Sequence, residues 1–183
     1  MLIAREKKKS NIAEYILYMW QLEDLLRGLD LDMERIKEQL ILPFRPDQET
    51  AREMYAWYDN LTEMMRLEKV QQAGHVRAVQ NNVDELTELH FYLLHKAHDR
   101  RYHQLVTAAA TNLVEFRSKA GAGNEISDVE LALNGLYGHL LLRLRKADVS
   151  QQTRQAMDTF SKMIAYLAAQ YRKMETEEER LLE

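Results

Sequence analysis

The sequence predicts an all-α protein, folded as a single-domain bundle of six or seven helices. Apolar residues recur at three- and four-residue steps along almost the whole chain, which is the period of an amphipathic helix. No segment has the sustained alternation of apolar and polar residues that is typical of a half-buried strand. The two prolines and most of the six glycines fall where the helical period stops, so we expect them to separate helices.

The first predicted helix extends to about Leu26. Gly28 follows it and suits the left-handed residue that commonly ends a helix. A second, short helix begins at about Asp32. It is expected to stop before Pro43, because proline disfavours helical geometry in the residue ahead of it.

Asp47 is expected to cap the third helix, a long one that Gly74 ends or kinks. A fourth helix starts near Val76 and loses its apolar register around residues 97–100, where we place a break. The fifth helix follows this break. Residues 121–124, Gly-Ala-Gly-Asn, form the clearest loop in the chain.

The sixth predicted helix, near residues 127–146, is apolar on most of its faces, so we expect it to lie centrally in the bundle. Gly135 and Gly138 each weaken a helix by up to about 1 kcal/mol, which predicts that a neighbouring helix or aromatic ring approaches closely there. Ser150 is expected to cap the last helix. Its acidic tail, about residues 175–183, should fray because negative charge lies at the negative end of the helix dipole.

The composition fits one helical domain over residues 1–183 and excludes several kinds of site. Hydrophobic residues make up 46% of the chain and charged residues 30%, which argues against disorder. Because there is no cysteine, the chain has no disulfide, cysteine nucleophile or thiolate metal site. The formal net charge of −4 provides no global positive field for nucleic acid.

We expect a cytoplasmic protein whose partner is neither a membrane nor a nucleic acid. Residues 1–9 lack the order of a secretory signal, in which a basic stretch precedes an apolar one. No window approaches the run of about 18 apolar residues needed to span a bilayer. The absence of cysteine also fits a reducing compartment.

Three ionisable residues interrupt apolar helical stripes and are the candidate site residues: Glu23, Glu68 and His90. Charge on a core-facing stripe is costly unless it is paired, hydrogen-bonded or used. Two carboxylates and an imidazole can bind a divalent metal, and a carboxylate beside a histidine can act as a general base. We favour the structural interpretation, in which each group makes a buried hydrogen bond or reaches the edge of its stripe, because most buried polar groups are structural.

Two enzyme patterns are absent or weak. No histidine has a glutamate three residues before it, which counts against a ferritin-like di-iron oxidase. The pair His98-Asp99 resembles that of metal-dependent phosphohydrolases of helical fold, but such a dipeptide often arises by chance at this composition. The residues that would complete that site are His75 or His90 upstream and Asp128 or Asp158 downstream.

Aromatic residues surround two helices more widely than one core stripe needs. A surplus of this kind indicates either a partner or ligand surface, or packing against more than two neighbours. The residues are Tyr15, Tyr18, Trp20, Tyr55, Trp57 and Tyr58.

Three segments carry a family resemblance: Asn-Ile-Ala-Glu-Tyr-Ile-Leu-Tyr-Met-Trp-Gln-Leu-Glu-Asp at 11–24, Gly-His at 74–75, and Gly-Leu-Tyr-Gly-His-Leu-Leu-Leu-Arg-Leu at 135–144. Over nearly the whole chain, in similar order, the sequence resembles an uncharacterised family of small helical proteins from Bacteroidetes-type bacteria, classed as a domain of unknown function. The resemblance implies a bacterial cytoplasmic protein and supplies no activity or catalytic residue.

The sequence therefore predicts a non-enzymatic protein-interaction or regulatory helical module with no cofactor, and with a second copy or another protein as its partner. The alternative is a metal-dependent enzyme or a small-ligand-binding bundle that uses Glu23, Glu68 and His90. The first interpretation is favoured because no complete catalytic constellation is visible in the sequence.

Overall fold

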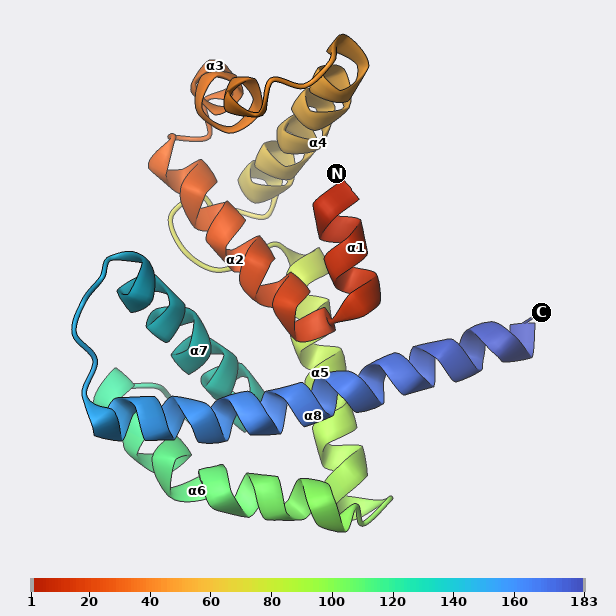
Figure 1. Cartoon of the computed structure of the whole chain (residues 1–183), viewed down its shortest axis with the longest axis vertical. Helices are drawn as coiled ribbons and strands as arrows, with labels where there is room; N and C mark the ends of the chain where they lie inside the picture. Colours follow the sequence, from red (N-terminus) through yellow and green to blue (C-terminus); the bar gives the residue numbers. More distant parts are fainter. Residues whose placement is uncertain (1, 183) are drawn as a thin grey trace.

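The computed structural model describes the backbone of residues 2–182 and the side chains of residues 4–177 and 180. In this part of the chain there are eight α-helices and no strand, which confirms the predicted all-α, single-domain fold with one helix more than expected (Figure 1). A π-helical turn, Lys37–Ile41, and a 3-10 turn, Leu42–Phe44, extend the third helix. The helices are α1 (Leu2–Ser10), α2 (Ile12–Gly28), α3 (Met33–Ile36), α4 (Gln48–Leu67), α5 (Arg77–His95), α6 (Arg100–Ala120), α7 (Asp128–Leu144) and α8 (Gln151–Leu182).

The additional helix comes from a break at Asn11. This residue is extended, with φ −158° and ψ 105°, and its side-chain oxygen accepts hydrogen bonds from the backbone N–H groups of Ala13 and Glu14. These bonds satisfy donors that the start of α2 would otherwise leave unpaired. The first predicted helix corresponds to α2, and α1 was not predicted because apolar spacing alone passes over the capping residue.

Gly28 does not have the left-handed role predicted for it. It is the last residue of α2, and the left-handed residues are Asp30 and Leu31, with φ of 58° and 56°. Leu29 and Leu31 are buried on either side of Asp30. The free energy gained by burying these two leucines therefore offsets the cost of left-handed geometry in residues other than glycine, and this stabilises the turn.

The short helix that Asp32 caps continues past the point where it was expected to stop. The helix begins where it was predicted to, and the Asp32 side chain caps it by accepting hydrogen bonds from the N–H groups of Glu34 and Arg35. The π turn and the 3-10 turn then carry the chain through Pro43, and Leu42 keeps right-handed helical dihedrals of φ −59° and ψ −33°. Proline has no N–H to donate to an α-helical hydrogen bond, so the backbone continues past it through the hydrogen-bond patterns of the wider π turn and the tighter 3-10 turn.

The predicted boundaries from the third helix onward agree with the structure, apart from the end of α4. Asp47 caps α4, and the break near residues 97–100 separates α5 from α6. Gly121, with φ 62°, ends α6 in the predicted loop. Ser150 accepts a hydrogen bond from the backbone N–H of Thr153 at the start of α8.

α8 is the spine of the molecule. It packs against α2, α5, α6 and α7, and it crosses the lower half of Figure 1, while α3 and α4 form an arm at the opposite end. Its 32 residues extend about 48 Å. The helix continues through the acidic tail to Leu182, and fraying of this tail stays a prediction. None of the described helices is both long and apolar enough to cross a membrane.

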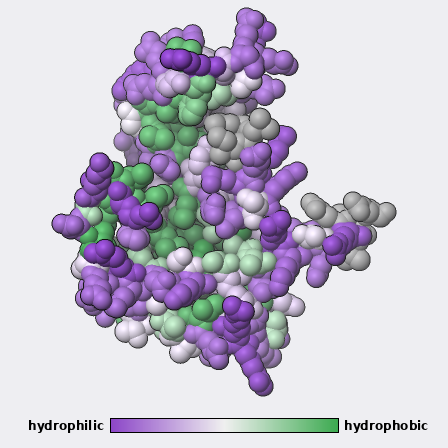
Figure 2. All heavy atoms as spheres, viewed as in Figure 1, coloured by the Kyte–Doolittle hydropathy of each residue, from purple (hydrophilic) through white to green (hydrophobic). Residues whose placement is uncertain are grey.

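α7 contacts α2, α5, α6 and α8, as expected of a central helix. The predicted close approach is confirmed at Gly135, where an added Cβ would lie 3.0 Å from two carbons of the Phe160 ring. Gly138 has no such neighbour within 4 Å. The last turns of α7 reach the surface, with Leu142 40% and Leu144 58% exposed, and Figure 2 shows hydrophobic side chains over this end of the helix.

Candidate functional site

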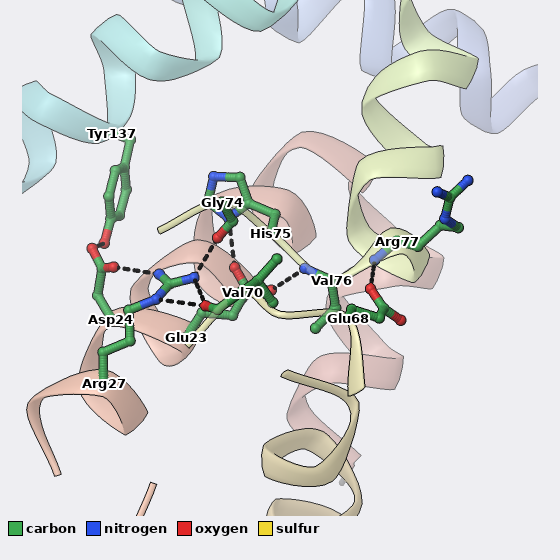
Figure 3. Close-up of polar contacts among 10 residues, drawn as sticks. All are labelled: Glu23, Asp24, Arg27, Glu68, Val70, Gly74, His75, Val76, Arg77 and Tyr137. Atoms are coloured by element: carbon green, nitrogen blue, oxygen red, sulfur yellow. Dashed lines mark hydrogen bonds and ion pairs between the residues drawn. The ribbon is translucent and has the colours of Figure 1, made fainter. Parts of the chain in front are cut away.

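A polar junction joins α2 to residues 68–76, the segment that links α4 and α5 (Figure 3). Glu23, at its centre, is fully buried, as the sequence predicted. Its Oε2 atom lies 2.5 Å from Nδ1 of His75, and its Oε1 atom accepts a hydrogen bond of 2.9 Å from the backbone N–H of Val76. We define the polar junction as Glu23, Asp24, Arg27, His75 and Tyr137.

The His75 ring is held between the carboxylate and an indole. It stacks on Trp20 with 4.4 Å between ring centroids and 14° between planes, and Tyr137 meets the edge of the same indole at 5.8 Å. An ionised carboxylate only accepts hydrogen bonds, so with Glu23 in that form the Nδ1 atom of His75 is the donor of this contact. The Nε1 atom of Trp20 is buried and has no hydrogen-bond partner among the described residues.

Arg27 fastens the linking segment to α2 one turn beyond Glu23. Its Nε and Nη2 atoms donate hydrogen bonds to the carbonyl of Val70 at 3.2 and 3.0 Å, and Nη2 also donates to the carbonyl of Gly74. Its Nη1 atom pairs with the Asp24 carboxylate at 2.8 Å, which in turn accepts a 2.6 Å hydrogen bond from the Tyr137 hydroxyl. Gly74, with φ +87°, gives the segment the turn that this arrangement requires.

The surroundings of the junction favour neutral tyrosine hydroxyls. Burial raises the pKa of Tyr137, and its hydrogen bond to Asp24 raises it further. Burial also raises the pKa of Tyr15, and the negative charge of Glu23 adds to that effect. The negative charge of the junction is therefore carried by its carboxylates, and the Tyr137 hydroxyl acts as a hydrogen-bond donor to Asp24.

The chemistry open to this junction is proton transfer at His75. A carboxylate on Nδ1 fixes the orientation of an imidazole and leaves Nε2 as the reacting atom. The ring is accessible only in part, because its side chain is 22% exposed and one face lies on Trp20. Both oxygens of Glu23 and all three guanidinium nitrogens of Arg27 make hydrogen bonds to groups of the fold, so the junction positions helices more than it presents reactive groups.

Glu68 lies outside the core, contrary to the projection that placed it on the apolar stripe of its helix. α4 ends at Leu67, earlier than Gly74, and Lys69 has a left-handed φ of 60°. Glu68 caps the end of α4 and its N–H still donates to the carbonyl of Met64, but its side chain lies past the last buried residue of the stripe, Met65, and is exposed. Its carboxylate accepts a 2.5 Å hydrogen bond from the backbone N–H of Arg77, at the start of α5.

His90 is buried, as predicted, but its hydrogen-bond partner is not one of the groups that bind Glu23. Its Nδ1 atom lies 2.8 Å from the hydroxyl of Tyr102, and the two rings meet edge to face. Burial lowers the pKa of His90, a lowering that the charge of Asp128 opposes and that of His95 increases. Burial likewise raises the pKa of Tyr102. Both groups are therefore neutral near pH 7.

The three candidates are thus held by three different sets of partners. Among the described residues, no three histidine, aspartate or glutamate side chains are grouped so that they could hold a metal ion. The Asp99 carboxylate is likewise used by the fold, since it accepts hydrogen bonds from the Tyr102 N–H and the Tyr166 hydroxyl. The first of these bonds is the largest cause of the lowered pKa of Asp99.

The partners of Glu23 were not predicted from the sequence. His75 and Val76 lie at the end of a segment without helical period, so a helical projection gives them no direction. The sequence could have indicated Arg27 as a neighbour of Glu23, because it lies four residues later and therefore on the same face of α2. Tyr137 reaches Asp24 from a helix more than a hundred residues later in the sequence, at a separation of 113.

A cleft of about 660 Å³ lies between five helices, α1, α2, α4, α5 and α8, and we call it the five-helix cleft. Apolar side chains line it, and two members of the aromatic surplus, Tyr15 and Trp57, stand among them. Its charged side chains are mainly basic and come from α1 and α8. The apolar lining residues are Met19, Leu61, Met64, Val76 and Val79; the basic ones are Arg5, Lys8, Lys9 and Arg172.

The polar junction and the five-helix cleft meet at Val76. The backbone N–H of Val76 binds Glu23, while Val76 also lines the cleft. Glu23 thereby fixes the start of α5 against α2, and both helices contribute lining residues. The junction therefore sets the position of one side of the cleft.

Comparison with known proteins identifies one family. Its model, described as a domain of unknown function (DUF4924), matches residues 1–178. No curated protein and no solved structure matches the chain.

Proposed function

The chain belongs to this family of unknown function, and we propose that it is a non-enzymatic helical module that binds a small amphipathic molecule in the five-helix cleft. The observation that carries the proposal is the cleft itself. Its volume of about 660 Å³ lies within the range of sites for small ligands, roughly 300–1,000 Å³. Its lining combines apolar side chains with charged ones, which suits a molecule that has both an apolar and a polar part.

The state of the polar junction supports a role without catalysis. Glu23 and Arg27 are committed to hydrogen bonds that fix the segment 68–76, and the candidates Glu68 and His90 each have their own partner. A catalytic group needs access to a substrate as well as a suitable neighbour. The binding module proposed here is bacterial and cytoplasmic, as the sequence predicts, and needs no cofactor.

Binding of twelve-carbon amphipaths tests the proposal. Trp57 lines the cleft and Trp20 is buried in the core, so we expect a saturable change in tryptophan emission on titration with dodecanol, dodecanoate or dodecylamine. Ala78→Phe, which fills part of the cleft from α5, should abolish the change; Ala110→Phe, on an exposed site of α6, should not. If none of the three compounds binds, or if both variants bind alike, the proposal is wrong.

A second candidate, the protein-interaction or regulatory module predicted from the sequence, rests on a different surface. The exposed Leu142 and Leu144 lie on two faces of the end of α7, over which hydrophobic side chains gather in Figure 2, and exposed apolar patches are typical of interfaces. The partner would be a second copy of the chain. Sedimentation velocity over a range of concentrations should reveal a dimer that Leu144→Glu dissociates, and a monomer at all concentrations would exclude self-association.

A further inference from the structure

We infer that the ligand of the five-helix cleft is an amphipathic anion: a single aliphatic chain that ends in one acidic head group, bound as a free molecule. This inference rests on the proposed function and adds the charge of the ligand to it. The head group is assigned to the basic wall of the cleft, defined as Arg5, Lys8, Lys9 and Arg172, and the aliphatic chain to the apolar lining.

The basic wall stands out against the charge of the whole protein. The chain has a formal net charge of −4, yet the residues around the cleft include four cationic side chains and one acidic one, Glu175. That glutamate also acts on Tyr171, whose pKa it helps to raise. A concave surface lined mainly by one sign of charge concentrates ligands of the other sign. Neutral and cationic amphipaths gain nothing from this wall.

The cations of the wall are brought together by the fold. Three of them come from α1 and the fourth, Arg172, from α8, more than 160 positions later in the sequence. Among the side chains that the structure describes, no carboxylate lies within 4.0 Å of these four groups, whereas the neighbouring Lys7 pairs with Glu14 at 3.4 Å. Lys8 instead lies over the ring of Tyr15, 5.7 Å from its centroid. Among the described side chains that line the cleft, four cations therefore stand against one carboxylate, and an acidic head group complements this balance.

The apolar lining favours an aliphatic chain over a polar ligand such as a nucleotide or a sugar. Met19 and Met64 contribute flexible thioether side chains that adapt to irregular shapes, and the buried side chains of Leu61 and Val79 also line the cleft. The walls come from five helices that surround the cleft, while a partner helix would need a long groove between two helices. A compact molecule with one chain fits this enclosure best.

Matched amphipaths and matched charge variants test the inference. Dodecanoate should bind at least tenfold more tightly than dodecanol, and dodecylamine should bind most weakly. Lys9→Gln with Arg172→Gln should weaken dodecanoate binding about tenfold and leave dodecanol unchanged. The control, Lys119→Gln with Lys162→Gln, removes the same charge from exposed sites elsewhere and should change either affinity less than twofold. Each methylene removed from the chain should weaken binding about fourfold.

The outcomes separate this inference from the proposed function. If dodecanol binds as tightly as dodecanoate and the wall variant has no effect, the charge assignment is wrong while the cleft still binds amphipaths. If acetate or inorganic phosphate competes as well as dodecanoate, the aliphatic part is wrong. Co-sedimentation with phosphatidylglycerol vesicles that depends on the basic wall, without binding of monomeric dodecanoate, would assign the wall to a membrane surface and overturn the free ligand. If no amphipath binds, both proposals fail.

Discussion

Replacement of Glu23 by glutamine tests whether the polar junction holds residues 68–76 against α2. The change keeps the shape of the side chain and one carbonyl oxygen, which still accepts from the N–H of Val76. It removes the negative charge that pairs with His75 in a fully buried position. A hydrogen bond to a charged group contributes about 1.5–3 kcal/mol, so we expect Glu23→Gln to lower the free energy of unfolding by about that amount.

Urea denaturation followed by circular dichroism measures the effect. Glu14→Gln on the same helix is the matched control: its carboxylate is exposed and pairs with Lys7, so it should change the free energy of unfolding by less than about 1 kcal/mol. In a double-mutant cycle with His75→Gln, the two junction changes should be non-additive by at least about 1 kcal/mol. A Glu23→Gln protein within 0.5 kcal/mol of the wild type, or strictly additive changes, would refute this account of the junction.

Three further predictions concern packing, pH and metal. Gly138→Ala should raise the free energy of unfolding by up to about 1 kcal/mol, while Gly135→Ala should lower it by about 1–2 kcal/mol because its Cβ would press on the Phe160 ring. If urea denaturation shows that both variants change this free energy in the same direction, the packing described at Gly135 is contradicted. Burial lowers the pKa of His90, so the unfolded chain takes up the proton first as the pH falls, and the free energy of unfolding should fall on acidification below the unfolded pKa of about 6.5. The variant His90→Gln should flatten this pH dependence. An unchanged slope in that variant would exclude His90 as its source. Treatment with a chelator should leave the melting temperature unchanged, since no group of metal ligands occurs among the described residues; a fall would revive the metal site proposed from Glu23, Glu68 and His90.

The helices were predictable because their ends are encoded locally. Asp47 and Ser150 cap their helices through hydrogen bonds to backbone two or three residues away, which a sequence pattern can represent. The burial of Glu23 and His90 was predictable for the same reason, since one helical period determines which face a side chain lies on. Glu68 failed this test because it caps the end of α4, just before the left-handed turn at Lys69 and past the last buried residue of the stripe, Met65.

The partners of the buried groups were not predictable from a local pattern. His75 meets Glu23 across 52 positions, through a segment whose path depends on Gly74 and on the hydrogen bonds of Arg27. The same holds for the five-helix cleft, whose cations lie in a basic run near the start of the chain and at Arg172. The sequence marked Trp57 as part of an aromatic surplus, but helical spacing alone does not distinguish a cleft wall from a core.

The position of α8 in the chain has a consequence for synthesis. The other helices of the core, α2, α5, α6 and α7, all pack against a helix that leaves the ribosome after them. Phe160, Met163 and Leu167 of α8 are fully buried in the folded protein. Until α8 emerges from the ribosome, the apolar surfaces that these side chains later contact stay exposed on the growing chain. Throughout that time the helices already made therefore keep apolar faces that no other helix of the core covers, and this is when the nascent chain is most prone to aggregate.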